Sequence, residues 1–413
     1  MDAKLSIHPT PAAWLRESDL AGYVPAFREY LAKRQYAAHT QRLYLCCVAH
    51  FARWLTGRQR IPHEFTDDHV RTFLDEHLPI CACPQPVRRC RHEVRAALRH
   101  MFVVLHGAGV AIKLQPPTAV DRELGDFDDH MHHARGLART TRAQRLRIVR
   151  QFLQESVGAV GSPTLTAGNL RLFIGRQLQC WSPASAQVLA SALRAYVRFR
   201  IARGDQVNHL LPVIVSPANW RMAQLPETLS STEVARLLEA FGPDVPSVRR
   251  AYAMVRCLVD LGLRANEVAG LDLDDIDWNA GIIRICRGKL RRVDILPLPH
   301  ATGCAIASYL HSERPCTSSR RVFVQHVAPV GDPIGPGVVR RAVRDAYRRI
   351  GLVHRRVHAL RHTLASRLLE GGGTLKEVAD ILRHRELNTS LIYTKIDTVR
   401  LSAVALPWPG SAP

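Results

Sequence analysis

The chain has 413 residues and a formal net charge of +21, and its basic residues are six lysines and fifty-one arginines. This length suits two or three domains of about 100 to 200 residues each, and the positive excess suits a polyanionic partner such as nucleic acid. The polar start, residues 1–16, and the absence of any apolar run of about 18 residues argue against a signal peptide and a membrane span. We therefore expect a cytoplasmic protein whose ten scattered cysteines are mostly reduced.

The first predicted module is a helical bundle within residues 1–115, with helices over about 20–109. The run QRLYLCCVAHFARWL follows Thr40 and carries apolar residues at helical spacing. Residues 66–68 are typical of an N-terminal cap for HVRTFLDEHL, and EVRAALRHMFVVLHGAG closes on glycine.

A second bundle is predicted within residues 116–222. The stretch 113–129 is rich in proline and acidic residues and is predicted to be a linker, as is the stretch 208–226. Phe51 and Phe152 each lie eleven residues after a threonine, and Phe73 and Phe173 each lie seven after one. The pattern indicates an internal duplication with a shift of about 95 to 101 residues. Convergence of two ordinary amphipathic bundles is the alternative.

Residues 223–413 form the third predicted domain. Ser230 with Glu233 is typical of a capping box that opens a helix. Another helix is predicted over 247–262, and the runs GIIRICRG and RRVDILPLP predict two strands of a hairpin or small sheet. Further helices are expected at about 299–312, 336–350, 358–370, 374–383 and 387–395. The predicted fold class is mainly α, with a small antiparallel β-sheet in the C-terminal domain and two helical bundles before it.

Candidate functional residues begin in LGLRANEVAGL. Arg264 follows a glycine that ends a helix, and Glu267, three residues on, can orient it. Lys289 lies at the turn between the two predicted strands, among arginines. A lysine can release a proton where an arginine, whose pKa exceeds about 12, cannot.

The stretch 358–393 supplies the remaining candidates. His358 and Arg361 are three residues apart, so on a helix they share a face and can point at one group. His384 and Tyr393 follow, nine residues apart. Taken alone, Tyr393 beside a Leu-Ile pair is more often a packed aromatic residue than a nucleophile.

Together the motifs LGLRxxE, a lysine about twenty-five residues on, HxxR and LxHxxxxxxxxY resemble the tyrosine recombinases, the phage integrase family. The resemblance covers about residues 225–400, and the two bundles before it are similar to the family's core-binding domains. It implies a mainly α catalytic domain acting on double-stranded DNA, with no cofactor and no metal. It also implies a site-specific recombinase or integrase, of a mobile element in our interpretation, that works as a homo-tetramer on paired sites. The accessory proteins stay unknown.

The resemblance assigns a role to each candidate. Tyr393 would attack a phosphodiester and form a 3′-phosphotyrosine, and Lys289 would protonate the leaving 5′-oxygen. The phosphate would be held by Arg264, which Glu267 supports, and by Arg361. His358 and His384 would hydrogen-bond the phosphate and help the tyrosine lose its proton. Two alternatives remain, a type IB topoisomerase-like enzyme and a catalytically silent DNA-binding protein.

This chain departs from the family pattern at two places. Arg383 stands before His384 where glycine is common, and the turn that carries Lys289 lacks the usual glycine after the lysine. These departures leave the placement of His384 and the flexibility of that turn open. The final residues, 401–413, could pack in cis or be passed to a neighbouring subunit, and we favour the latter.

Two further clusters could suggest a metal. Cys81, Cys83, Cys90 and His92 lack the usual CxxC spacing, so we expect thiols packed near a helix end and keep zinc as the alternative. An acidic stretch lacks the glycine and final glutamate of a calcium loop, and we interpret it as a turn ahead of a strand: Asp272, Asp274, Asp275 and Asp277.

Overall fold

The computed structural model describes residues 6–57, 67–110, 118–156, 165–216, 225–287, 292–353, 355–383 and 392–393. Within these ranges the protein is mostly helical with one three-stranded antiparallel sheet, so the predicted fold class is confirmed. Contacts divide the chain into two compact units, Met1–Arg53 with Cys83–Val104 and Met222–Pro413, and Trp54–Ala82 with Leu105–Arg221. No helix in the described ranges is both long and apolar enough to cross a bilayer.

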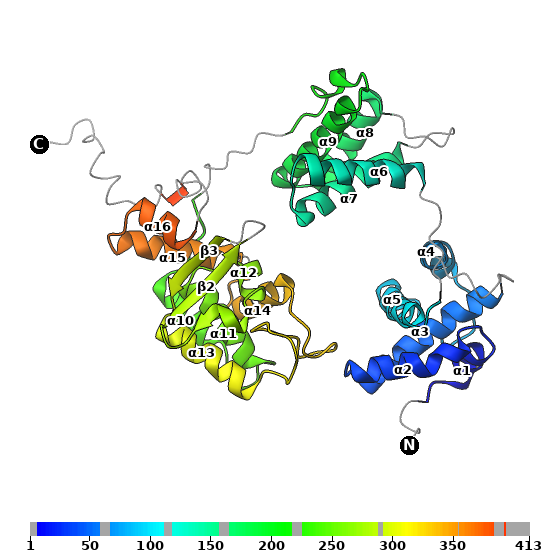
Figure 1. Cartoon of the computed structure of the whole chain (residues 1–413), viewed down its shortest axis with the longest axis horizontal. Coiled ribbons are helices and arrows are strands. Elements are labelled where there is room, and N and C mark those ends of the chain that lie inside the picture. Colours follow the sequence, from blue (N-terminus) through cyan, green and yellow to red (C-terminus); the bar gives the residue numbers. More distant parts are fainter. Residues whose placement is uncertain are drawn as a thin grey trace, which may run out of the picture. The chain divides into compact units, whose positions relative to one another are not determined.

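The described residues before 110 form the α-helices shown in Figure 1, α1 Pro9–Arg16, α2 Val24–Lys33, α3 Ala38–Thr56, α4 Asp67–Thr72 and α5 Arg91–Gly107. Helix α1 was not predicted. Its first residue is a proline, and the residue before it, His8, caps the helix because its Nδ1 accepts a hydrogen bond from the Thr10 amide. In α5, His100 lies between the hydroxyls of Tyr30 and Tyr36, at 3.2 Å and 3.0 Å. These bonds join α2, the following turn and α5.

The predicted linker over residues 113–129 is wrong for its second half. Residues from 119 onward form α6, Ala119–Asp129, and the described residues after it form α7 Arg139–Glu155, α8 Ala167–Cys180 and α9 Pro183–Ala202. Thr118 and Asp121 form a capping box, and Leu124 and Phe127 are buried in the core that α6 shares with α7, α8 and α9. The acidic residues that suggested a linker are helical, and one of them, Glu123, accepts a 2.7 Å hydrogen bond from the Tyr196 hydroxyl on α9.

The second predicted linker also begins inside a core. Leu210 and Ile214 are buried among the residues of α6–α9. The Arg194 guanidinium donates a 2.6 Å hydrogen bond to the Ile214 carbonyl, which ties this segment to α9. A linker can therefore start only after about residue 215.

The phenylalanines that suggested a duplication are all buried. Phe51 lies on α3 and Phe152 on α7, while Phe73 lies in the helical turn Phe73–His77 and Phe173 on α8. The Phe152 and Phe173 rings pack edge to face, with their centroids 5.4 Å apart. The duplication and the boundaries at 115 and 222 stay predictions.

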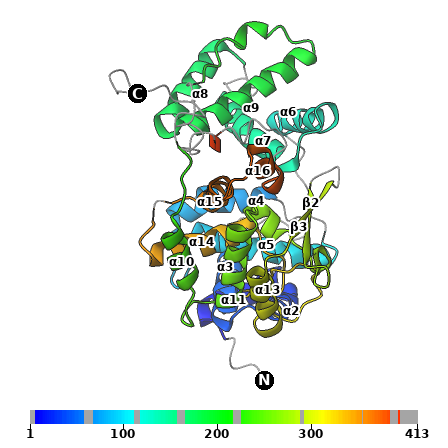
Figure 2. The same cartoon turned by 90° about the vertical axis from the view of Figure 1, so that its left-hand side faces the viewer.

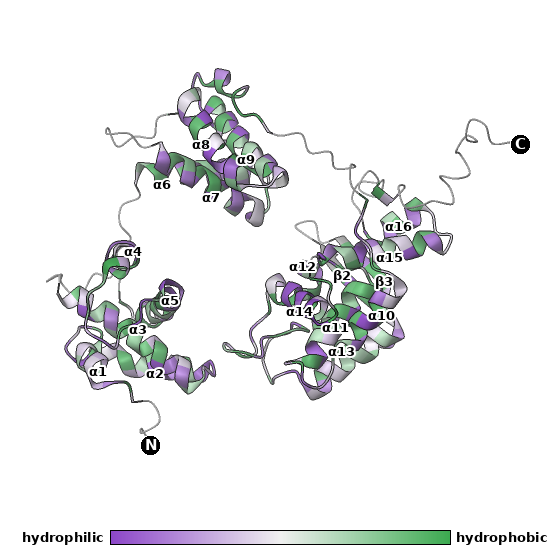
Figure 3. Ribbon diagram, turned by 180° about the vertical axis from the view of Figure 1, so that it is seen from behind, coloured by the Kyte–Doolittle hydropathy of each residue, from purple (hydrophilic) through white to green (hydrophobic). Residues whose placement is uncertain are grey.

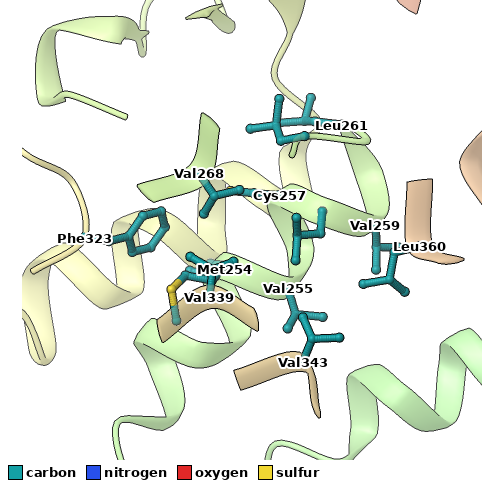
Figure 4. Close-up of a cluster of buried hydrophobic side chains, with 14 of the residues drawn as sticks. Met254, Val255, Cys257, Val259, Leu261, Val268, Phe323, Val339, Val343 and Leu360 are labelled. Atoms are coloured by element: carbon teal, nitrogen blue, oxygen red, sulfur yellow. The ribbon is translucent and has the colours of Figure 1, made fainter. Parts of the chain in front are cut away.

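The C-terminal part begins at the predicted capping box of Ser230 and Glu233. Its elements are α10 Ser231–Glu239, α11 Val248–Asp260, α12 Ala265–Ala269, β1 Ile276–Asp277, β2 Ile282–Arg287, β3 Arg292–Pro297, α13 His300–Ser312, α14 Pro336–Arg349, α15 His358–Glu370 and α16 Leu375–Ile381. Helix α11 is central: it contacts α10, α12, α13, α14 and α15. Its Met254, Val255 and Val259 pack among Val339, Val343 and other apolar residues (Figure 4).

The sheet has the order β1-β2-β3, with Ile276 opposite Ile283 and Ile283 opposite Leu296. The hairpin of β2 and β3 agrees with the prediction, whereas β1, only two residues long, was not predicted. The acidic stretch forms the expected turn before β1. Its carboxylates meet arginines: Asp272 lies 3.0 Å from Arg321, and Asp277 lies 2.9 Å from Arg284.

Candidate active site

Helix α15 presents the HxxR motif. Its first turn is anchored by Thr363, whose hydroxyl accepts a 2.8 Å hydrogen bond from the Leu229 amide and donates one to the Ala359 carbonyl. Figures 1 and 2 show α15 beside α16. His358 opens the helix, and Arg361 lies one turn later, as the spacing predicted. Partial burial, followed by the positive charges of Arg361 and Arg264, lowers the pKa of His358.

Arg361 is 4% exposed and connects three segments. Its guanidinium donates hydrogen bonds to the Gly262 carbonyl, just after α11, and to the Leu382 carbonyl, just after α16. Burial and the neighbouring Arg264 and Arg383 lower its pKa, because each disfavours another positive charge. The side chain is therefore fixed in place before any substrate binds.

Glu267 receives two arginines. Its carboxylate lies 2.9 Å from Arg264 Nη1 and 3.0 Å from Arg383 Nη2, and it also accepts the Arg264 amide. Burial raises the Glu267 pKa, but the Arg264 amide and the two guanidiniums outweigh it, so the pKa is lowered. The carboxylate stays ionised and holds Arg264, which is partly exposed, in position.

Arg383, which departs from the resembled motif, has a backbone conformation that favours glycine. Its φ is +57°, in the left-handed region that glycine adopts without steric cost. A non-glycine residue there costs about 1–2 kcal/mol. In this chain the Arg383 side chain is buried against Glu267, so the ion pair offsets part of that cost.

Tyr393 is buried, 1% exposed, in a small cluster with Ala365, Val378 and Leu382. Its hydroxyl lies 3.0 Å from Nδ1 of His362. Burial raises the pKa of the phenol, while the charges of Arg361 and Arg264 act in the opposite direction. The two arginines of the sequence motifs therefore act on the same hydroxyl.

A cleft of about 510 Å³ opens beside these residues. Its lining includes Arg264, His358 and Arg361 together with four arginines that the sequence did not single out, Arg340, Arg344, Arg355 and Arg356. None of the described lining residues is acidic. Helix α14, which carries two of the arginines, is largely hydrophilic in Figure 3. The cleft is suited to an anionic chain.

The structure thus brings together Arg264, Glu267, His358, Arg361 and Tyr393. Lys289 and His384 lie outside the described residues. Sequence reasoning missed His362 and the ion pair of Arg383 with Glu267. A signal for His362 existed, since it lies four residues after His358 and so on the same helical face.

Gly262 should be intolerant of a side chain. Its φ is +57°, and a Cβ would meet Leu364 and Leu382 at 2.8 Å and 2.9 Å. Gly281 is the matched control, with φ +63° and open space around it. We expect Gly281→Ala to lower the free energy of unfolding by about 1–2 kcal/mol and Gly262→Ala by a further 1–3 kcal/mol, about the cost of overpacking. Equal losses in urea unfolding would contradict the predicted clash.

Two residues of the cysteine cluster, Cys90 and His92, lie side by side at the start of α5. Cys90 and His92 are close, with Sγ 2.8 Å from Nδ1, and their ligand atoms and one of Glu93 lie within 4.8 Å of one another. Cys81 is buried and Cys83 is half-buried. Packed thiols stay the prediction.

Comparison with known proteins points to one family. The phage integrase family matches residues 227–400. The putative integrase/recombinase y4rA of Sinorhizobium fredii is 34% identical over 404 residues, which cover 96% of each chain. Tyrosine recombinase XerC of Azotobacter vinelandii is 32% identical over 291 residues, 68% of this chain and 94% of that one.

Solved structures share the fold. The Tn1549 transposon integrase in complex with transposon right end DNA has a TM-score of 0.51 at 16% identity, over 68% of this chain and 99% of that one. A lambda integrase dimer bound to a COC′ core site has a TM-score of 0.51 at 14% identity, over 67% and 94%. The chain belongs to the phage integrase family, the tyrosine-type site-specific DNA recombinases.

Proposed function

We propose that this recombinase breaks and rejoins double-stranded DNA at specific sites through a 3′-phosphotyrosine at Tyr393, on behalf of a mobile element. The observation that carries the proposal is a buried tyrosine that packs with Leu382, whose carbonyl is held by Arg361, an arginine that also lines the basic cleft. A free phenol has a pKa near 10 and is a weak nucleophile at neutral pH. Nearby guanidiniums favour its phenolate and so favour attack.

The two arginines would also hold the scissile phosphate. Arg264 is partly exposed in the cleft and fixed by Glu267, and Arg361 is fixed by two backbone carbonyls. Guanidiniums fixed in advance stabilise the charge that builds on the non-bridging oxygens without reorganising during the reaction. His358 lines the same cleft and would donate a further hydrogen bond, as would His384.

The reaction consists of two transesterifications. In the first, the Tyr393 oxygen bonds to phosphorus and the 5′-oxygen leaves with a proton, for which Lys289 is the proposed donor. In the second, a 5′-hydroxyl of the partner strand attacks the phosphotyrosine and releases the phenol. The ester keeps the energy of the broken phosphodiester, so the proposed cycle consumes no nucleotide cofactor.

Recombination joins four strands, and we propose a homo-tetramer on two paired sites. The proposed helical modules at 1–115 and 116–222 would contact DNA beside the catalytic domain, and the doubled module would lengthen the contacted site. Support comes from the lambda integrase structure, which is a dimer on a core site. Sedimentation with one and with two cognate duplexes would test the assembly.

A nicked suicide duplex tests the chemistry. Loss of the short 5′-hydroxyl fragment traps the cleaved state, so we expect an SDS-resistant adduct with the full chain. A catalytically silent DNA-binding protein forms no adduct. Exchange between two cognate sites separates a recombinase from a topoisomerase-like enzyme, which relaxes plasmid DNA without exchange.

The role of Lys289 has its own test. Lys289→Ala should slow cleavage by about 100-fold or more, the usual contribution of a general acid. A substrate with a 5′-bridging sulfur has a leaving group that needs no proton, so it should restore most of the rate. A variant that stays equally slow on both substrates would contradict the assignment.

A further inference from the structure

His362 contacts the Tyr393 hydroxyl and has no role in the function proposed above. Its Nδ1 lies 3.0 Å from the phenolic oxygen, and the two rings meet edge to face with centroids 5.6 Å apart. His362 belongs to the same face of α15 as His358, whose ring centroid is 5.9 Å away. The Ser366 hydroxyl donates a 3.1 Å bond to the His362 carbonyl, within the same helix.

The charges around His362 keep its imidazole neutral. Burial lowers its pKa to about 4, the positive charges of His358 and Arg361 act in the same direction, and only Glu227 opposes them. A neutral imidazole has one N–H and one nitrogen lone pair. A phenol is a stronger hydrogen-bond donor than an imidazole N–H, so the favoured arrangement has the Tyr393 hydroxyl donating to the Nδ1 lone pair.

We propose that His362 accepts the phenolic proton of Tyr393 during DNA cleavage and returns it during rejoining. This inference rests on the proposed function. In the forward step the O–H bond of the phenol breaks, an N–H bond forms at Nδ1, and the phenolic oxygen bonds to phosphorus. The bond from phosphorus to the 5′-oxygen breaks, and that oxygen takes its proton from the separate acid. The second transesterification reverses each transfer, so protons balance over the cycle.

The weak basicity of His362 fits a late transfer. In the resting protein the phenol holds its proton far more strongly than the imidazole does. A phosphodiester bound by Arg264, Arg361 and His358 brings a negative charge that raises the proton affinity of His362. The basicity of the phenolic oxygen falls sharply as this oxygen bonds to phosphorus. Transfer of its proton to Nδ1 of His362 then becomes favourable.

The test distinguishes two roles for His362: holding the Tyr393 hydroxyl by a hydrogen bond, and removing its proton. Asparagine reaches about as far as Nδ1 of histidine, and its amide oxygen can accept the phenolic hydrogen bond but cannot take the proton. On the nicked suicide duplex at pH 7 we expect His362→Asn to form the adduct about 100-fold more slowly. DNA affinity and melting temperature should stay at wild-type values.

Two further readouts distinguish a base from a structural residue. The 5′-bridging sulfur substrate should restore Lys289→Ala but not His362→Asn, because a better leaving group does not deprotonate the phenol. The rate of His362→Asn should rise with pH about tenfold per unit as phenolate forms. The wild-type rate should depend far less on pH above about 5, where His362 is already unprotonated.

The matched control is His326→Asn. His326 is another partly buried histidine of this part of the chain, with a pKa also lowered to about 4 by burial and Arg250, and it bonds Ser247 at 2.8 Å. Its adduct rate should equal the wild type. If His362→Asn does not fold, His362→Gln replaces it in every assay. A folded His362 variant that cleaves at the wild-type rate, or that the sulfur substrate fully restores, overturns the inference. No adduct in the wild type overturns the proposed function instead.

Discussion

Tyr393→Phe should abolish the covalent DNA adduct, with a loss of at least about 10⁴-fold, because phenylalanine has no oxygen to bond to phosphorus. The fold should survive. The ring stays in its cluster with Ala365, Val378 and Leu382, and the loss of the hydroxyl bond to His362 costs about 1 kcal/mol. The measurement is adduct formation on the nicked suicide duplex, alongside a thermal melt.

Tyr309→Phe provides the matched control. Tyr309 is also fully buried in this part of the chain, and its hydroxyl accepts a 3.3 Å bond from the Val324 amide. Its replacement should cost similar stability and leave the adduct intact. An undiminished adduct in Tyr393→Phe would show that another residue is the nucleophile.

Arg361→Lys is expected to have the second largest effect. Lysine keeps the charge but cannot hold the Gly262 and Leu382 carbonyls and a phosphate with one planar group. We expect cleavage to fall by about 100- to 1,000-fold, the usual effect of losing one donor to developing charge. The free energy of unfolding should fall by about 1–3 kcal/mol, because a buried carbonyl is left without a donor.

The control for Arg361→Lys is Arg348→Lys, an exposed arginine on α14 whose partner Asp345, at 2.6 Å, can also pair with lysine. This variant should cleave and melt like the wild type. Single-turnover cleavage on saturating DNA measures the chemical step, and urea unfolding measures the stability. Wild-type cleavage by Arg361→Lys would mean that positive charge alone suffices at this position.

The elements that the sequence predicted correctly depend on interactions between residues close together in the chain. The capping box of Ser230 and Glu233 and the three-residue spacing of His358 and Arg361 depend only on helical geometry, so both are where the pattern placed them. The β2–β3 hairpin also follows from its alternating run. Helix α6 was not predicted because the proline and acidic residues of this stretch are typical of a linker. The two apolar residues that α6 buries, Leu124 and Phe127, were given less weight.

The parts of the site that could not be predicted depend on backbone angles and tertiary contacts. The left-handed φ of Arg383 is not visible in its residue type, and its ion pair with Glu267 joins positions 116 residues apart. The bonds from Arg361 to two carbonyls likewise require the ends of α11 and α16 to meet at α15. Motif spacing identified Arg264, His358, Arg361 and Tyr393, and only the fold could show which atoms they contact and that His362 and Arg383 join them.

The burial of Tyr393 has a consequence for the protein before it meets DNA. With 1% of its surface exposed, the hydroxyl is shielded from solvent and from reagents that modify phenols. The tyrosine of an unbound chain would therefore be unreactive, and the protein would not cleave chromosomal DNA that it contacts only transiently. Reactivity would be released only where bound DNA places a phosphodiester within reach of the hydroxyl while His362 still contacts it.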